Sequence, residues 1–315
     1  MAVTLDDDAD FENVVHRYRR ELHVHCYRML SSFDEAEDAV QETMIRAWAK
    51  RATFVRGENV RAWLYRIATN VCLDELRRRR RAPQVHSFAD VPELQPYPDQ
   101  LLDSLAPRGS RPDDVAVARD TIELAFVAAL QVLPAQQRAA LIMRDVIGWS
   151  AAEAAQILDT SVPALNSALQ RARAAVAQHR PQPDHARRAR LGDDERALLG
   201  RYIALHENPD PAAMAALVRD DIRITMPPQP VCFDGWAAVS SLLRTAFGPD
   251  GLGEWRALPT SVNRMPAAAC YLRAPSDERF TAYKLDVLRI TDGLIAEITT
   301  FERRVFDWLD LPAEI

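Results

Sequence analysis

Cysteine and glycine are both scarce in this 315-residue chain, which contains four cysteines and ten glycines. The cysteines, Cys26, Cys72, Cys232 and Cys270, lie far apart and form no Cys-x-x-Cys pair, which argues against a zinc site and against a disulfide framework. We expect reduced, buried thiols. The apolar runs are too short to span a bilayer, and the N-terminal stretch MAVTLDDDAD is acidic where a signal peptide is basic. These absences predict a cytoplasmic protein without a membrane partner.

Motifs of common catalytic and cofactor sites are absent as well. The chain has no GK followed by Ser or Thr, no G-x-G-x-x-G and no H-E-x-x-H, and the pair His23 and His25 has no further metal ligand nearby in the sequence. We therefore expect no metal, no cofactor and no catalytic residue. With 48% hydrophobic residues, the chain is globular and long enough for two or three domains.

The formal net charge of -6 is distributed unevenly along the chain. Residues 11–82 carry 15 basic and 10 acidic side chains, and residues 121–192 carry 8 and 5, whereas residues 193–315 carry 13 and 19. Nucleic acid attracts basic surfaces through its phosphates. Two basic blocks followed by an acidic block predict two nucleic-acid-facing modules with a different domain attached.

Helical periodicity, proline content and strand-like alternation divide the chain into segments. Helical spacing predicts the two basic modules, proline-rich acidic sequence predicts the linker between them, and two helical segments followed by strands with an Asp292-Gly293 hairpin turn predict an α+β domain. The predicted segments are an acidic tail at 1–10, a helical module at 11–82, a linker at 83–120, a helical module at 121–180, a linker at 181–192 and the α+β domain at 193–315.

The most informative motif is WSAAEAAQILDTSVPALNSALQRARAAV, which runs from Trp149 to Val176. The stretch 151–158 predicts a short helix, and Ser161 is a suitable cap for a second one. Between them, Asp159 stands where such turns often have glycine. One face of the second helix is apolar, and the other presents side chains that reach base edges and phosphates when a helix lies in a major groove: Asn166, Ser167, Gln170, Arg171 and Arg173. This pattern predicts a helix-turn-helix, with an ordinary helical hairpin as the alternative.

At these residues the chain resembles the promoter-recognition domain of bacterial sigma factors, in particular the extracytoplasmic-function group. LPAQQRAALIMRDVIGWSAAEAAQIL is similar to the first half of that domain, and SVPALNSALQRAR is similar to its recognition helix, which reads the minus-thirty-five element. FDEAEDAVQETMIRAWAK resembles the polymerase-binding helix of the family, and TFVRGENVRAWLYRIATNVCLDELRRRR resembles the part that opens the minus-ten element. The resemblance covers about residues 11–178. It implies that promoter DNA and core RNA polymerase, through its large-subunit coiled coil and its flap, are the partners.

The resemblance also assigns roles to individual residues of the first module. It implies that one helix docks on the polymerase coiled coil, and the residues that we place on its docking face are Asp38, Gln41, Glu42 and Arg46. It implies that a loop and the helix after it hold a base turned out of the duplex, through Phe54, Arg56 and Asn70. The run of five arginines from 77 to 81 spreads around its helix, so we expect phosphate contacts, from Arg77 and Arg78 in particular. Trp63 has the spacing of a core residue.

The segment 193–315 is not part of a minimal sigma factor. Its element order and the segment MPPQPVCFDGW resemble SnoaL-like domains of the NTF2-like superfamily, which implies a cone with a pocket. The candidate pocket residues are Tyr202, His206, Trp236, Trp255, Tyr283 and Asp286. The expected fold is therefore multidomain, with two all-α sigma domains followed by an α+β cone.

Three functions compete at this point. We expect a sigma factor whose acidic C-terminal domain modulates activity, by contact with the basic modules or with the linker. In the first alternative the C-terminal domain is a hydrolase or isomerase that uses Asp221, His206 or Asp286 as a general base. In the second alternative the chain binds duplex DNA without joining polymerase.

Overall fold

The structure of the chain is a computed structural model, and it divides into two compact units. It describes residues 8–54, 59–79, 91, 94–103, 121–179, 192–248 and 251–315. The helical unit contains the described residues of 8–79, 101–103 and 124–179, and the C-terminal unit contains those of 91–100, 121–123 and 192–315. Parts of the predicted linker therefore belong to the C-terminal unit. None of the described helices is long and apolar enough to cross a membrane.

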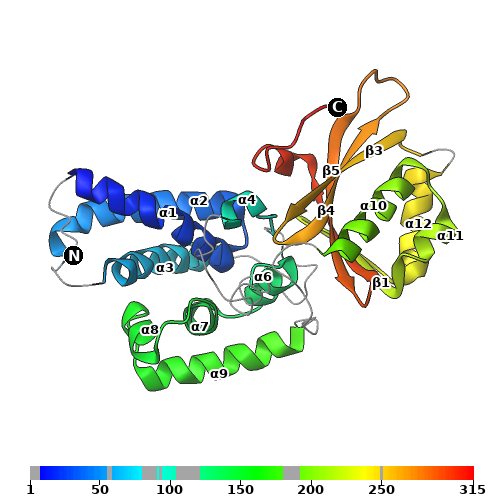
Figure 1. Cartoon of the computed structure of the whole chain (residues 1–315). Coiled ribbons are helices and arrows are strands. Elements are labelled where there is room, and N and C mark those ends of the chain that lie inside the picture. The colour runs from blue at the N-terminus through cyan, green and yellow to red at the C-terminus, as the bar shows by residue number, and fades with distance from the viewer. Residues whose placement is uncertain are drawn as a thin grey trace. The chain divides into compact units, whose positions relative to one another are not determined.

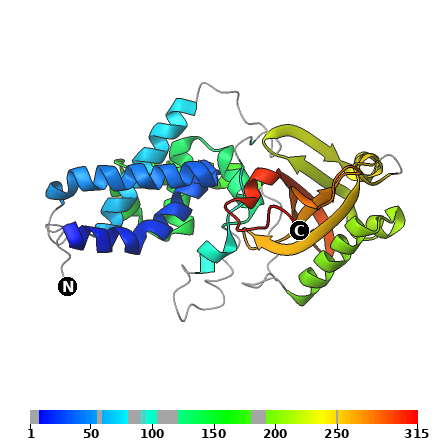
Figure 2. The same ribbon diagram turned by 90° about the horizontal axis from the view of Figure 1, so that it is seen from above.

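Three long helices form the first module of the helical unit. Their bounds are α1 (Asp8–Leu30), α2 (Phe33–Lys50) and α3 (Val60–Arg79), with the short 3-10 turn η1 (Arg51–Thr53) after α2. Figure 2 shows α1 and α2 lying side by side. Ser32 caps α2 by accepting a hydrogen bond from the backbone N–H of Glu35, and fully buried residues such as Tyr27 and Leu64 fill the space between the helices.

Shorter helices make the second module. They are α6 (Leu124–Gln131), α7 (Ala135–Leu141), the π-helical turn η3 (Ile142–Val146), α8 (Ala151–Ile157) and α9 (Val162–His179), and the one-turn α4 (Asp99–Asp103) precedes them in the chain. Arg138 of α7 is buried. Its guanidinium donates to the carbonyl oxygens of Gln131 and Leu133 and to that of Met29 in α1, so it joins the two modules. Arg61 of α3 makes a second contact between the modules, because its guanidinium lies 4.8 Å from the ring centre of Trp149.

The C-terminal unit packs helices against one face of a six-stranded sheet (Figure 1). Its strands have the order β2-β1-β6-β5-β4-β3, and only β1 and β6 pair in parallel. The elements are α10 (Asp193–Glu207), α11 (Pro211–Ala215), β1 (Val218–Met226), β2 (Gln229–Asp234), α12 (Gly235–Phe247), β3 (Glu254–Val262), β4 (Met265–Arg273), β5 (Thr281–Thr291), β6 (Leu294–Glu302) and the 3-10 turn η4 (Arg303–Phe306). This helix-then-sheet order confirms the α+β cone that the sequence implied.

The predicted hairpin turn is confirmed in this unit, and the prediction for the cysteines of the whole chain is partly wrong. Asp292 and Gly293 both have positive φ, 53° and 75°, and form the tight turn between β5 and β6. All four cysteines are free, and three of them are buried, but Cys232 is exposed. Cys232 lies in the edge strand β2, where side chains alternate between the two faces, and because its neighbour Phe233 packs against the core, Cys232 faces the other side.

The buried histidines of α1 generate a stability prediction. Burial lowers the pKa of His25 to about 3 and that of His23 to about 4, so both are neutral in the folded protein at pH 5. In the unfolded chain they bind protons below about pH 6.5, so stability is present above that pH and is lost as the pH falls. Between pH 6.5 and pH 5 the free energy of unfolding should fall by about 2 kcal/mol less in His25→Gln than in the wild-type protein. Glutamine can still form the hydrogen bond to Thr69.

The measurement is urea unfolding of the full chain at both pH values, followed by pulsed hydrogen exchange in α1 so that the helical unit is monitored. The matched control is His16→Gln, because His16 is exposed on the same helix and its replacement should leave the pH dependence unchanged. If the stability of His25→Gln depended on pH as that of the wild-type protein does, buried His25 would not be a cause of the pH dependence.

Candidate nucleic-acid interface and ligand cavity

Helices α8 and α9 form the helix-turn-helix that the sequence predicts. Ser150 and Glu153 make a capping box at the start of α8, and the Ser161 hydroxyl accepts a hydrogen bond from the backbone N–H of Ala164 at the start of α9. Asp159 has φ of 49° in the turn. Aspartate tolerates this left-handed conformation better than most residues, so the turn does not need glycine. The predicted base-reading residues are all exposed: Asn166, Ser167, Gln170, Arg171 and Arg173.

The two arginines on this face differ in their partners. Arg173 makes a two-pronged ion pair with Asp145 of η3, at 2.8 Å from Nε and 2.6 Å from Nη2. In the described part of the chain, Arg171 forms no ion pair. Any other partner of Arg173 would have to displace the Asp145 carboxylate.

The predicted minus-ten residues occupy two places in the first module. Phe54 follows η1 and is half-buried, with its ring centre 5.4 Å from that of Trp63, which is confirmed as a core residue. Asn70 is exposed on α3, and Arg56 lies outside the described residues. Sequence reasoning missed Asn59, whose side-chain oxygen accepts from the backbone N–H of Arg61 and starts α3.

The arginines at the end of α3 are divided between surface and structure. Arg77 and Arg78 are exposed and pair with Asp74 and Glu75 one turn earlier. Arg79 contacts Glu35 of α2 and the carbonyl oxygen of Leu30, so it ties α3 to the neighbouring helices. Arg80 and Arg81 lie outside the described residues.

The face of α2 predicted to bind polymerase carries both polar and apolar side chains. Asp38 and Gln41 are exposed, while Arg46 is held by Glu42 at 2.6 Å and by Asp74 of α3 at 3.1 Å. The sequence analysis missed the exposed apolar pair Ile45 and Trp48, which are 65% and 36% exposed. They follow Gln41 by four and seven residues, which places them on the same stripe of the helix. This spacing is the feature of the sequence from which they could have been predicted.

A cavity of about 430 Å³ opens in the C-terminal unit. Four of the six predicted pocket residues line it, namely Tyr202, Trp255, Tyr283 and Asp286. The other two predictions are wrong as lining residues. His206 lies behind Asp286, and Trp236 packs against the hydrophobic core. Most of the remaining wall is apolar, from β1 and α12, and Lys284 is a polar lining residue that sequence reasoning missed.

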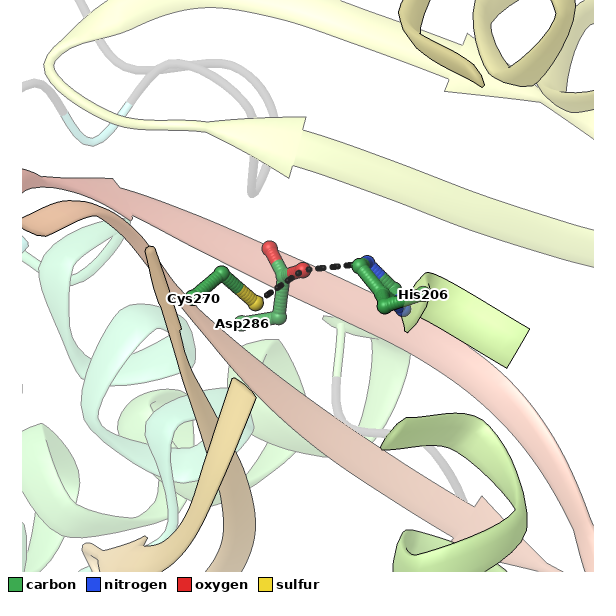
Figure 3. Close-up of side chains that lie close together, drawn as sticks. All are labelled: His206, Cys270 and Asp286. Atoms are coloured by element: carbon green, nitrogen blue, oxygen red, sulfur yellow. Dashed lines mark hydrogen bonds and ion pairs between the residues drawn. The ribbon is translucent and has the colours of Figure 1, made fainter. Parts of the chain in front are cut away.

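Asp286 of β5 is the centre of a buried hydrogen-bond network (Figure 3). Its carboxylate accepts from the Tyr202 hydroxyl at 3.0 Å and from the Thr300 hydroxyl at 2.6 Å, and it pairs with the Lys284 ammonium at 2.6 Å. The His206 Nε2 atom and the Cys270 Sγ atom lie 3.5 Å and 3.7 Å from it. Burial acts to raise the pKa of Asp286, but Lys284 and His206 outweigh it and hold that pKa below its ordinary value.

These contacts argue against catalysis and against a metal at the network. A carboxylate whose pKa is held below its ordinary value by a neighbouring ammonium is a weak base for a substrate proton. The third candidate base, Asp221, is exposed, pairs with Arg219 and is not a lining residue of the cavity. His206, Cys270 and Asp286 offer donor atoms within 4.8 Å of one another, but burial raises the pKa of the Cys270 thiol and Lys284 already neutralises Asp286.

Comparisons with known proteins identify the two helical modules. Residues 14–82 match the family Sigma-70 region 2, and residues 123–176 match Sigma-70, region 4. The ECF RNA polymerase sigma factor SigG of Mycobacterium tuberculosis H37Rv is 35% identical over 96% of this chain and 84% of its own. SigW of Bacillus subtilis is 30% identical over 54% of this chain and 88% of its own. The crystal structure of M. tuberculosis SigJ shares the fold, with a TM-score of 0.64, 21% identity and coverage of 98% and 100%.

The buried ion pair generates the prediction from this subsection. In Lys284→Met the Asp286 carboxylate stays buried without its counter-ion, so we expect the C-terminal unit to lose about 3–5 kcal/mol of stability. Adding Asp286→Asn to Lys284→Met removes the second charge and should restore most of the loss. The readout is the urea midpoint for exchange of β5 amides in the full chain.

Arg273→Met is the matched control, because it breaks the more exposed pair with Glu254 and should cost less than about 1 kcal/mol. If Lys284→Met cost no more than this control, the ion pair would not be what stabilises the unit.

Proposed function

The chain belongs to the extracytoplasmic-function sigma factors of the sigma-70 family, and from this premise we propose that its C-terminal unit controls transcription by holding the linker between the two helical modules. Sigma factors bind core RNA polymerase and promoter DNA and initiate transcription. The residue assignments and the control by the C-terminal unit are the proposed part.

The observation that carries the proposal is the contact of one buried side chain, Asn263, with two points of the chain between the modules: Tyr97 inside the linker and Ile122 just after it. Asn263 lies in the turn between β3 and β4. Its side-chain amide donates to the carbonyl oxygen of Ile122 at 2.7 Å, and its side-chain oxygen accepts from the backbone N–H of Tyr97 at 2.7 Å. Its own backbone N–H donates to the carbonyl oxygen of Tyr97 at 2.9 Å. We call this set of contacts the linker clamp.

Neighbouring contacts support the linker clamp. The backbone N–H of Arg264 donates to the Asp99 side chain at 2.7 Å, and Pro98 forms a bridge with Val262. The indole N–H of Trp308 donates to the carbonyl oxygen of Pro96. Tyr97 is 1% exposed, so the linker is bound as part of the core of this unit rather than resting on its surface.

The linker clamp has a geometric consequence for promoter binding. The minus-ten and minus-thirty-five elements are separate stretches of the promoter, and each base pair between them adds about 3.4 Å of duplex. The chain between the modules has to span this distance. Because Tyr97 and Ile122 bind the same side chain, the residues between them add nothing to the reach. The clamp is therefore a restraint, and its release favours transcription.

For DNA we propose two separate tasks in the helical unit. The exposed face of α9, with Arg171 at its centre, binds the minus-thirty-five element, because its side chains stand free of the core. Phe54 and Asn70 hold an extruded base of the minus-ten element, because an unstacked base needs an aromatic wall and an amide. Arg77 and Arg78 bind phosphates nearby, and the stripe of α2 from Asp38 to Trp48 docks on core polymerase.

The two DNA tasks predict different defects. Arg171→Ala should weaken promoter binding by about 1–3 kcal/mol, whereas Arg173→Ala should cost less because Arg173 is already paired with Asp145. Asn70→Ala should leave the closed complex intact and slow the appearance of permanganate-reactive thymines. Filter binding and permanganate footprinting with core polymerase measure the two steps, and each variant is the other's control. If Asn70→Ala opened the promoter duplex at the normal rate, Asn70 would not hold the extruded base. If Arg171→Ala bound promoter DNA normally, Arg171 would not contact the minus-thirty-five element.

The linker clamp predicts an increase in activity. Asn263→Ala should raise run-off transcription from a promoter with both elements severalfold, because it removes the side-chain bonds to Tyr97 and Ile122 and so weakens the clamp. Asn263→Asp should raise it as well, because its buried carboxylate cannot donate to the carbonyl oxygen of Ile122. Asp292→Ala is the matched control, since Asp292 has a similar positive φ in an exposed turn. Limited proteolysis reports release of the linker. Release without any change in transcription would contradict control through the clamp.

A further inference from the structure

We propose that the cavity of the C-terminal unit binds a neutral, largely apolar small molecule that has a carbonyl oxygen, and that the Lys284 ammonium donates to this oxygen. This inference rests on the proposed function in one respect, because the ligand is the signal to which the C-terminal unit responds when it controls transcription. The binding itself is a property of the cavity and needs no polymerase.

The size and walls of the cavity determine the apolar part of the ligand. Its volume of about 430 Å³ is within the range of small-molecule sites. One wall is aromatic: the ring centres of Phe247 and Tyr283 lie 5.3 Å and 5.2 Å from that of Trp255. Aliphatic side chains such as Ile224 and Leu243 line the cavity as well. A flat ring system fits this combination, since it buries apolar area and packs against aromatic faces.

The polar part of the ligand follows from Lys284. Its side chain is 21% exposed and lines the cavity, and of its three N–H donors one is used by Asp286. An oxygen acceptor on the ligand satisfies a remaining donor. The ammonium also lies 5.6 Å from the ring centre of Trp255, so a carbonyl bound there leaves the rest of the ligand against the aromatic wall.

The charges at this end of the cavity exclude charged ligands. Lys284 pairs with Asp286, and Glu302, the residue opposite Lys284 in β6, also lines the cavity, so a ligand carboxylate would join two anions. A ligand ammonium has no lone pair with which to accept a hydrogen bond from Lys284. The Lys284 ammonium and His206 hold the pKa of Asp286 below its ordinary value, which makes it a weak base, so the site binds its ligand without converting it.

The test uses 6-propionyl-2-(dimethylamino)naphthalene, a neutral ketone whose fluorescence reports the polarity around it, with the full-length protein. We expect saturable binding with blue-shifted emission. Ala246→Phe, which fills the cavity, should weaken binding at least tenfold, and Leu258→Phe, at an exposed position outside the cavity, should not. Thermal unfolding checks that both variants fold. Equal binding by Ala246→Phe and the wild-type protein would overturn the site.

Displacement of this probe by three matched naphthalenes tests the ligand chemistry without changing the protein. Hydrophobicity alone makes 2-ethylnaphthalene a tighter ligand than 2-acetylnaphthalene, because the ketone loses more hydration on burial. We expect the opposite order, with the ketone at least as tight, because Lys284 supplies a charged donor. We expect 2-naphthoate to bind at least tenfold more weakly than the ketone. Tighter binding of the hydrocarbon or of the acid would overturn the assignment.

Failure of this proposal is distinguishable from failure of the linker clamp. If Asn263→Ala raises transcription but the probe does not bind, control through the linker stands and the ligand class is wrong. If the probe binds as expected but Asn263→Ala leaves transcription unchanged, the cavity is a ligand site and control through the linker is wrong.

Discussion

The pairing of polar groups that the fold removes from water is the constraint on which both units depend. An unpaired buried amide or charge costs more than most single contacts contribute, so each such group fixes its neighbours in place. Asn263 bonds its amide to backbone atoms of Tyr97 and Ile122, Asp286 bonds its carboxylate to Tyr202, Thr300 and Lys284, and Arg138 donates from its two NH2 groups to carbonyl oxygens of both helical modules. Each of these side chains fixes the positions of segments that are far apart in the sequence.

Patterns that are local in the sequence were sufficient to predict the helices, the helix-turn-helix and the α+β character of the C-terminal unit. The apolar stripe of α9 at Leu165 and Leu169 is buried as expected, because helical periodicity directly encodes which face meets the core. Four of the six pocket residues were also found, since aromatic residues and carboxylates of a cone are the groups that line its interior. The wide spacing of the cysteines predicted free thiols. It did not predict the exposure of Cys232, which depends on the place of its strand in the sheet.

What sequence reasoning missed depends on pairings between distant residues. Nothing around Asn263 distinguishes it from any turn asparagine, and its role appears only when Tyr97 and Ile122 are beside it. Lys284 looks like a surface lysine until Asp286 is seen to hold it inward. The cavity and the linker clamp also share one hairpin: Trp255 is near the start of β3, and Asn263 follows directly after its end. A ligand against Trp255 therefore contacts the same strand that positions the clamp.

The turn between β3 and β4 also changes how the length of the linker acts. Because Tyr97 and Ile122 are bonded to a single amide, the chain between them is a closed loop with respect to the rest of the protein. Adding residues to a closed loop costs little free energy, since the entropy of closure grows only with the logarithm of its length. Insertions after Pro98 and Asp99, which also bind this turn, would therefore leave the distance between the two docking points unchanged.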